Sequence, residues 1–452
     1  MSSNRLPVFD RRRAGALLHI GSLEGGLGRG GRAFIDWLAA AGFTVWQILP
    51  VGPTGPDGSP YWVRSDFAGN PAFIDSNEWP DLGSSAYPAF LESSRHWLDD
   101  YALFEVLSFV QGGVPWWSWP PELRDRHPDA LGRARQQYSS ELDRVKGVQF
   151  AFFSQWQRLR EHANARGVRL FGDLPFYVAP DSAETWAHRE QFQLDATGHP
   201  TAVAGVPPDY FSATGQLWGN PLYNWDVGQQ DQFKLWRARV GAQIQRVDVL
   251  RIDHFRALAA YWSVPAGAPD ARGGQWRQTP GEALMGVLWD DLGDLPIVAE
   301  DLGVITPDVE ALRKGFELPG MRVLQFAFSG EATNPHLPHM HERDSVVYTG
   351  THDNDTTLGW YRTLPENARQ QVDYFLRMTP NAMPEVLIRA ALSSVGELTI
   401  IPVQDLLSLG SEARLNTPGT STGNWNWRLN PGALTHELAQ QFRGLNGIYG
   451  RI

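Results

Sequence analysis

Residues Val247 to His254 read VDVLRIDH. Valine and leucine dominate the first half of this stretch, and charged residues dominate the second half. Because successive side chains of a strand point to opposite faces, Arg251 and Asp253 share one face with the valines, and Leu250 and Ile252 share the other. Apolar residues on both faces are typical of a strand that is buried on both sides in a parallel sheet.

Runs of this kind recur along the whole chain. The eight runs are Ala14 to Ile20, Thr44 to Pro50, Val168 to Pro175, Val247 to His254, Pro296 to Asp301, Met321 to Phe328, Ser345 to Asp353 and Leu398 to Asp405. Helical patterns lie between them, as in the apolar stripe that repeats every three or four residues from Val148 to Ala163. Strand alternating with helix eight times predicts an α/β fold, a (β/α)8 TIM barrel over residues 1–452.

Two connections are too long for a single helix, those after the second and third predicted strands. We expect an inserted, mainly helical subdomain at residues 62–148 and an inserted, loop-rich segment at residues 176–228 that forms a lid. Within the second insertion, Gly205 to Trp225 is crowded with Pro, Gly and aromatic residues and predicts a long ordered loop. Asp181 with Glu184 resembles a capping box, and Thr306 before Pro307 predicts another helix start.

Composition excludes several functions. The chain has 39 Lys and Arg against 50 Asp and Glu, a net charge of −11, which repels the phosphates of nucleic acids. It has no cysteine, so thiol chemistry and thiolate metal sites are excluded. The uncharged stretch Trp37 to Pro56 is too rich in Gly and Pro to span a membrane, and Ala14 to Ile20 is a poor signal peptide. We therefore expect a cytoplasmic protein with no membrane partner.

Carboxylates stand at the ends of five of the predicted strands, where the active site of such a barrel gathers. They are Asp173, Asp253, Glu300, Asp301, Asp353 and Asp405. Acids at strand ends also cap the following helices, and this alternative stays open for each residue taken alone. Five strands with the same feature favour a shared site.

Two of these acids have opposed surroundings. Arg251 should keep Asp253 ionised, as a nucleophile requires, although a salt bridge lining the barrel would look the same. Apolar residues precede Glu300, and such surroundings would raise its pKa and keep it protonated as a general acid. Asp353 could brace an oxocarbenium-like sugar, or it could form only an Asx turn. A pair of carboxyl groups with opposed environments is what glycosidic bond cleavage requires.

Aromatic side chains in predicted loops are the second signal, because flat rings suit the faces of sugars. They are Tyr61, Trp62, Tyr210, Phe211, Trp218, Tyr223 and Trp225. Packing beneath long loops is an equally open interpretation for each ring. A dinucleotide site at Gly26, Gly28 and Gly31 is disfavoured because the next predicted strand ends at Pro50 and no acid lies between Asp36 and Asp57 to hold a ribose. A metal site at the histidines of residues 336–341 is disfavoured because the H-E-x-x-H pattern is missing.

Three motifs resemble those of the 4-α-glucanotransferases called amylomaltases or disproportionating enzymes, glycoside hydrolase family 77. They are RIDHFR at 251–256, AEDLG at 299–303 and TGTHDND at 349–355. Further similar segments occur in family order, namely LPVGPTG at 49–55, SPY at 59–61, AGNP at 68–71, VPPDYFS at 206–212, WGNPLY at 218–223 and GNW at 423–425. The resemblance therefore covers the chain from the second strand almost to its C-terminus.

The resemblance implies a role for each matching residue. Asp253 would be the nucleophile, Glu300 the general acid and base, and Asp353 the stabiliser of the transition state. The implied substrate-binding residues are Arg251, His352, Tyr61, Asp209, Tyr210, Phe211, Trp218 and Asn424. The resemblance implies a maltodextrin or other α-1,4-glucan as donor, glucose or a maltooligosaccharide as acceptor, and neither a metal nor another cofactor.

The chain departs from the family pattern at Pro56, Ala257 and Met340-His341. These departures leave the acids untouched but bear on acceptor and secondary glucan contacts, and hence on chain-length preference. Two other functions stay open at this point. One is a retaining α-glucan hydrolase of the amylase type, with the same acids and a site more open to water; the other is a glucan-binding protein without turnover.

Overall fold

The predicted strands form one parallel sheet in a computed structural model that describes residues 8–208, 212–293, 295–377, 382–420 and 422–452. In sheet order from β10 the strands are β10 (Gly320–Val323), β11 (Ser345–Tyr348), β12 (Leu398–Pro402), β1 (Arg13–Leu17), β2 (Val45–Gln47), β3 (Arg169–Leu174), β6 (Val249–Ile252) and β9 (Ile297–Ala299). The Ala299 amide donates to the Pro319 carbonyl at 2.9 Å, which brings β9 to β10. The predicted barrel is confirmed.

Side chains that point inward fill the barrel as a separate apolar cluster. Val45, Phe171, Val249 and Tyr348 belong to this cluster, whereas Leu250 and its neighbours on the outer face pack against the helices. The alternation predicted for β6 therefore holds, and it directs Arg251 inward near the carboxyl end of the strand. The barrel interior is apolar except at the carboxyl ends of the strands, where charged side chains begin. In barrels of this kind, that end carries the active site.

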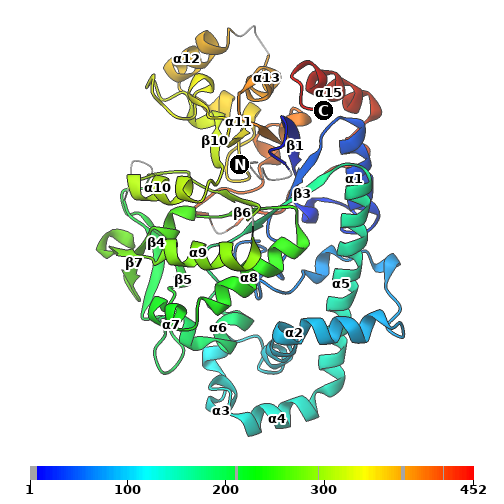
Figure 1. Cartoon of the computed structure of the whole chain (residues 1–452), viewed down its shortest axis with the longest axis vertical. Helices are drawn as coiled ribbons and strands as arrows, with labels where there is room; N and C mark the ends of the chain where they lie inside the picture. The colour runs from blue at the N-terminus through cyan, green and yellow to red at the C-terminus, as the bar shows by residue number, and fades with distance from the viewer. Residues whose placement is uncertain (1–7, 209–211, 294, 378–381, 421) are drawn as a thin grey trace.

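Helices surround the barrel, as Figure 1 shows. They include α1 (Arg29–Ala40), α8 (Lys234–Arg246), α9 (Gly281–Leu292), α10 (Pro307–Gly315), α11 (Thr357–Thr363), α12 (Glu366–Leu376), α13 (Glu385–Ser393) and α15 (His436–Ile448). Thr306 is the N-cap of α10 with Pro307 in its first turn, as predicted. The capping box assigned to Asp181 and Glu184 is wrong by one residue: Ser182 caps α6 (Ala183–Ala187) and pairs with Thr185.

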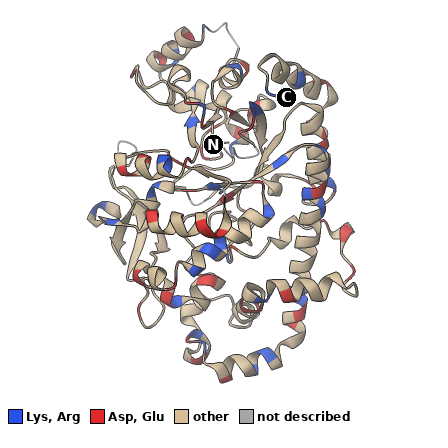
Figure 2. Cartoon of the chain, viewed as in Figure 1, with Lys and Arg blue, Asp and Glu red and all other residues tan. Residues whose placement is uncertain are grey.

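The connection after β2 carries α2 (Ala86–Val110), α3 (Pro121–Arg124), α4 (Pro128–Gln137) and α5 (Ser139–Ala165). The first three lie away from the barrel (Figure 1), whereas the second half of α5 packs against it through Phe152, Trp156 and Leu159. These helices share a second apolar cluster that includes Phe104, Trp116 and Trp119, and Trp186 of α6 joins it. Among the described residues, no helix has the length and the apolar character needed to cross a bilayer. Acidic and basic residues are interspersed along the chain (Figure 2).

A second, antiparallel sheet lies beside the barrel mouth. Its order is β5 (Gln216–Pro221), β4 (Ala202–Val206), β7 (Ala260–Pro265) and β8 (Gln275–Gln278). The prediction of a long loop from Gly205 to Trp225 is therefore wrong, since β5 occupies its centre and α7 (Trp225–Gln230) begins at its end. Pairing of β4 with β7, which follows the next barrel strand, stabilises this region, and such a long-range contact leaves no local pattern.

Gly15 provides a test of the barrel packing. A Cβ atom added there would lie 2.7 Å from the Val45 carbonyl oxygen and 2.6 Å from Ile400 Cδ1. We expect Gly15→Ala to lower the free energy of unfolding by about 1–3 kcal/mol, because the backbone of β2 cannot retreat without breaking its pairing. The matched control is Gly286→Ala in α9, where no atom lies within 4 Å and a gain of about 0.5–1 kcal/mol is expected. Equal thermal midpoints for the two variants would contradict this packing.

Candidate active site

Arg251 links two carboxylates at the mouth of the barrel. Its guanidinium donates to both oxygens of Asp173, at 2.9 and 2.7 Å, and contacts Asp253 Oδ1 at 2.8 Å. Asp173 ends β3 and is fully buried, whereas the Asp253 side chain is 30% exposed. The predicted pairing of Arg251 with Asp253 is therefore present, and the opening of the site lies on the side of Asp253.

Glu300 follows β9 and lies half-buried beside this pair. Its carboxyl group accepts hydrogen bonds from the backbone amides of His254, at 2.7 Å, and Leu302, at 3.0 Å. Burial first, and then the negative charge of Asp253, raise the pKa of Glu300 to about 8 against the opposing effect of Arg251. A carboxyl group with this pKa carries its proton at neutral pH, which agrees with the environment predicted from its apolar neighbours.

A left-handed turn connects Asp253 to Glu300. His254 has φ +51°, a conformation that is uncommon outside glycine, and it directs its backbone amide at the Glu300 carboxyl group. The next amide, of Phe255, donates to the Glu300 carbonyl at 3.2 Å. This short segment therefore fixes the spacing between the two acids.

Asp353 lies five residues after the end of β11, at the same end of the barrel. The His352 imidazole lies 3.3 Å from its carboxylate, and Asn416 donates to Oδ1 at 2.6 Å. Arg414 donates to the backbone carbonyl of Asp353 at 2.8 Å. These contacts fix the position of Asp353, and 45% of its side chain stays exposed to solvent.

An aromatic wall joins the acids. The rings of Tyr61 and His352 stack with centroids 5.1 Å apart, and Trp425 lies 6.1 Å from each. The Tyr61 hydroxyl donates to Asp173 at 2.7 Å. Burial and the negative charges of Asp173, Asp253 and Asp353 raise the pKa of this hydroxyl well above the usual value. Asn424 stands beside Trp425, and its amide bonds to Thr417 and Thr420 of its own loop.

A second aromatic wall, formed by Trp218, His254 and Tyr177, lies on the side of the site where Glu300 stands. Trp218 of β5 contacts His254 edge to face with centroids 4.7 Å apart, and Tyr177 packs against both rings. The predicted acceptor-side residues Asp209, Tyr210 and Phe211 lie outside the described residues. Tyr223 and Trp225 are buried among Phe176, Trp236 and their neighbours, so the hypothesis that they are sugar platforms is wrong.

Two of the acids at strand ends serve the fold. Asp301 accepts from the Met321 amide and pairs with Arg322 at 3.2 Å, which helps to join β9 to β10. Asp405 accepts from the hydroxyls of Thr349 and Thr357, each at 2.6 Å. Both side chains therefore have a structural role, but neither caps the helix that follows its strand, because Thr306 is the N-cap of α10 and Asp405 lies inside α14 (Val403–Leu406).

The disfavoured alternatives find no support in the structure. The Arg29 amide at the start of α1 donates to Asp75 at 3.2 Å, so a carboxylate already stands where a dinucleotide phosphate would bind. His336 accepts from the Val323 amide, and His341 bonds to Ser394 and to the His336 carbonyl. Among the described residues, no group of three or more His, Cys, Asp or Glu side chains is arranged to hold a metal ion.

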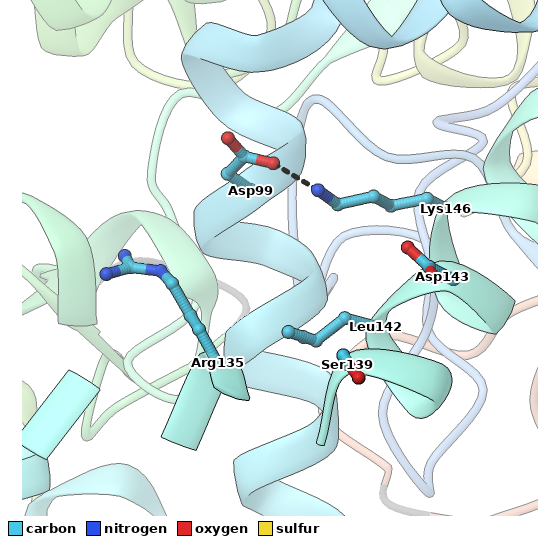
Figure 3. Close-up of a pocket in the computed structure, with 6 residues that line it drawn as sticks. All are labelled: Asp99, Arg135, Ser139, Leu142, Asp143 and Lys146. Carbon is cyan, nitrogen blue, oxygen red and sulfur yellow. Dashed lines mark hydrogen bonds and ion pairs between the residues drawn. The ribbon is translucent and has the colours of Figure 1, made fainter. Parts of the chain in front are cut away.

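A hollow of about 260 Å³ lies elsewhere, between α2, α4 and α5 (Figure 3). Its lining residues are Asp99, Arg135, Ser139, Leu142, Asp143 and Lys146. Lys146 pairs with Asp99 across it, and none of its lining residues is aromatic. It shares no residue with the cluster at the barrel mouth, which remains the candidate active site.

Comparison with known proteins identifies the family. The family model for 4-α-glucanotransferase, glycoside hydrolase family 77, matches residues 18–85 and 79–435. The chain belongs to this family. It is 45% identical to the 4-α-glucanotransferase of Thermus thermophilus, over 96% of this chain and 98% of that protein. It is 39% identical to the chloroplastic or amyloplastic 4-α-glucanotransferase of Solanum tuberosum, over 98% of this chain and 87% of that protein.

A solved structure agrees. The amylomaltase from Streptococcus agalactiae in complex with acarbose superposes with a TM-score of 0.93 at 32% identity, covering 98% of this chain and all of that one. The transferase interpretation of the sequence is thereby confirmed, and the hydrolase and binding-protein alternatives are less supported. The retaining mechanism fits the family, and an α-glucan is the substrate class.

Asn416 and Arg414 are site residues that sequence reasoning missed, because they reach Asp353 from a loop more than 60 residues away. We expect Asn416→Ala to lower kcat/KM roughly 10- to 100-fold, the effect of losing one hydrogen bond to a charged group. Disproportionation of maltotriose would measure it. Asn164→Ala, which removes an exposed hydrogen bond to Arg169 near the start of β3, is the control and should leave kcat/KM unchanged. Equal activities of the two variants would contradict a supporting role for Asn416.

Proposed function

We propose that Asp253 is the nucleophile, Glu300 the general acid and base, and Asp353 the stabiliser of the transition state in a retaining transfer of α-1,4-glucan segments. The observation that carries this assignment is the place of Asp253, which Arg251 contacts at 2.8 Å and whose neighbour His254 donates its backbone amide to the protonated Glu300 at 2.7 Å. Asp353 belongs to the same cluster through His352, whose ring stacks on Tyr61. Retaining transfer needs one carboxyl group that carries a proton and one that does not.

In the first step, Glu300 protonates the glycosidic oxygen while Asp253 attacks the anomeric carbon. The bond to the leaving glucan breaks, and a bond from Asp253 to the sugar forms. In the second step, Glu300 removes the proton from the 4-hydroxyl of the acceptor, and that oxygen displaces Asp253. Asp353 stabilises the positive charge that develops on the sugar in the transition state of each step.

The remaining residues position the substrate. Arg251 contacts Asp253, and His352 contacts Asp353, so Arg251 and His352 are placed to hold the sugar at the cleaved bond. Tyr61, whose ring stacks on His352, would pack against that sugar. We propose that the loop-rich segment 176–228 forms a lid over the acceptor side of the site. The residues of this segment expected to contact the acceptor are Asp209, Tyr210, Phe211 and Trp218. Asn424, from another loop, is expected to contact the substrate as well. Residues 62–148 are proposed as an inserted helical unit.

The donor is proposed to be a maltodextrin or another α-1,4-glucan, and the acceptor glucose or a maltooligosaccharide. With maltotriose as the only substrate, transfer gives glucose and a ladder of longer chains, whereas hydrolysis gives glucose and maltose alone. A cytoplasmic compartment stays a prediction, and the Solanum tuberosum relative is named for a plastid.

Trapping the covalent intermediate tests the assignment of the acids. In Glu300→Gln, a maltosyl fluoride donor should load the enzyme, because fluoride leaves without a proton, but the intermediate should persist without a general base. We expect the mass of one maltosyl group on the peptide that contains Asp253, and no adduct in Asp253→Asn. An adduct on Asp353 instead would reverse the assigned roles.

The raised pKa of Glu300 predicts the pH dependence of the reaction. The general acid must carry its proton, so kcat/KM for maltotriose should fall as the pH rises through about 8, rather than near the ordinary value of 4.5. With maltosyl fluoride as donor, this alkaline fall should disappear, because the leaving group needs no acid. The same alkaline fall with both donors would assign the ionisation to another group.

A further inference from the structure

Arg239 of α8 is a fully buried cation that no step of the proposed mechanism uses. Its guanidinium donates to Asp66 at 2.6 Å, to the Tyr223 hydroxyl at 2.6 Å, and to the carbonyls of Pro175 and Phe176 at 2.7 and 3.1 Å. These partners belong to three different connections, after β2, after β3 and after β5. One side chain therefore ties together three segments that meet beside the site.

The contact with Tyr223 closes the arrangement. The Tyr223 hydroxyl accepts a hydrogen bond from Arg239 and donates one to the Phe176 carbonyl at 2.7 Å. The Tyr223 hydroxyl oxygen therefore connects α8 to the segment after β3. Gln243, one helical turn further along α8, donates to the Asp66 carbonyl at 2.8 Å. Because Arg239, Asp66 and Tyr223 are buried, loss of one of them would leave a charge or a polar atom unpaired.

This cluster lies directly behind the wall that faces Glu300. Phe176 precedes Tyr177, whose ring packs against Trp218 and His254. Asn220, two residues after Trp218, donates to the Val178 carbonyl at 3.0 Å. Displacement of the segment 175–178 or of β5 would therefore move Trp218 away from His254.

We propose that Arg239 is a positioning residue that holds this wall closed and thereby determines how much of the glycosyl-enzyme is captured by a sugar rather than by water. The inference rests on the proposed function, because it concerns the second step at the same site. Water is far more concentrated than any acceptor, so transfer requires that the wall exclude it until the acceptor binds. A loosened wall would weaken acceptor binding and admit water while leaving the first step largely intact.

Two variants test this proposal. Arg239→Lys keeps the charge beside Asp66 but removes the planar fork that reaches all four partners, and Tyr223→Phe removes only the shared oxygen. The assay incubates each variant with maltotriose and compares hydrolysis, measured as new reducing ends, with transfer, measured as longer chains. We expect the ratio of hydrolysis to transfer to rise roughly tenfold and the KM for added glucose to rise, the scale of one charge-assisted hydrogen bond. The rate of loading from maltosyl fluoride should stay within about twofold.

The matched control is Arg451→Lys. Arg451 is also fully buried and donates to five backbone carbonyls, including those of Arg13 and Gly396, at the opposite end of the barrel. We expect it to lower the thermal midpoint without changing the ratio of hydrolysis to transfer.

If the Arg239 and Tyr223 variants likewise lose stability with an unchanged ratio, their role is structural and the inference is wrong. Tyr223→Phe alone decides the matter if Arg239→Lys does not fold. Failure of the proposed function would be seen separately, as the absence of an adduct on Asp253 in Glu300→Gln.

Discussion

The contact on which the site depends is the bridge from Arg251 to Asp173 and Asp253. A buried guanidinium loses its hydration, and two carboxylates at 2.7 and 2.8 Å offset that cost. Asp173 in turn binds the Tyr61 hydroxyl, so the bridge extends from β6 through β3 to the segment after β2. Removal of one member of such a buried pair typically costs about 3–5 kcal/mol, which makes the mouth of the barrel a single cooperative unit.

The chemistry of the site has a cost in stability. The pKa of Glu300 is raised to about 8 in the folded chain, against 4.5 when it is free. Between these values the folded protein holds a proton that the unfolded chain has released. Stability therefore falls as the pH rises from about 4.5 through about 8, because over this range only the unfolded chain gains free energy by releasing the proton. A carboxyl group in water would avoid this cost, but it would have no proton to donate at neutral pH.

The parts of the structure that were predictable from the sequence are those with a local cause. Apolar runs located the barrel strands, and the last residues of those runs located Asp253, Glu300 and Asp353, because the carboxyl ends of parallel strands meet at one end of a barrel. The second sheet was missed because β4 is stabilised by β7, which follows the next barrel strand. Asn416 and Arg414 were missed for the same reason, since their contact with Asp353 exists only after folding.

Tyr223 and Trp225 show where composition misleads. An aromatic residue in a segment rich in Gly and Pro fits either a sugar platform or packing beneath a loop, and only its neighbours decide between them. For Tyr223 the structure shows packing rather than a sugar platform, because its hydroxyl is hydrogen-bonded both to Arg239 and to the Phe176 carbonyl. The same contact is the basis for the proposal that this aromatic cluster, which lies outside the barrel interior, affects the reaction. In the proposed mechanism, acids at the strand ends break the glycosidic bond, but those acids do not distinguish a sugar from water. That distinction depends on how firmly the wall around Trp218 is held, and hence on contacts between segments far apart in the sequence.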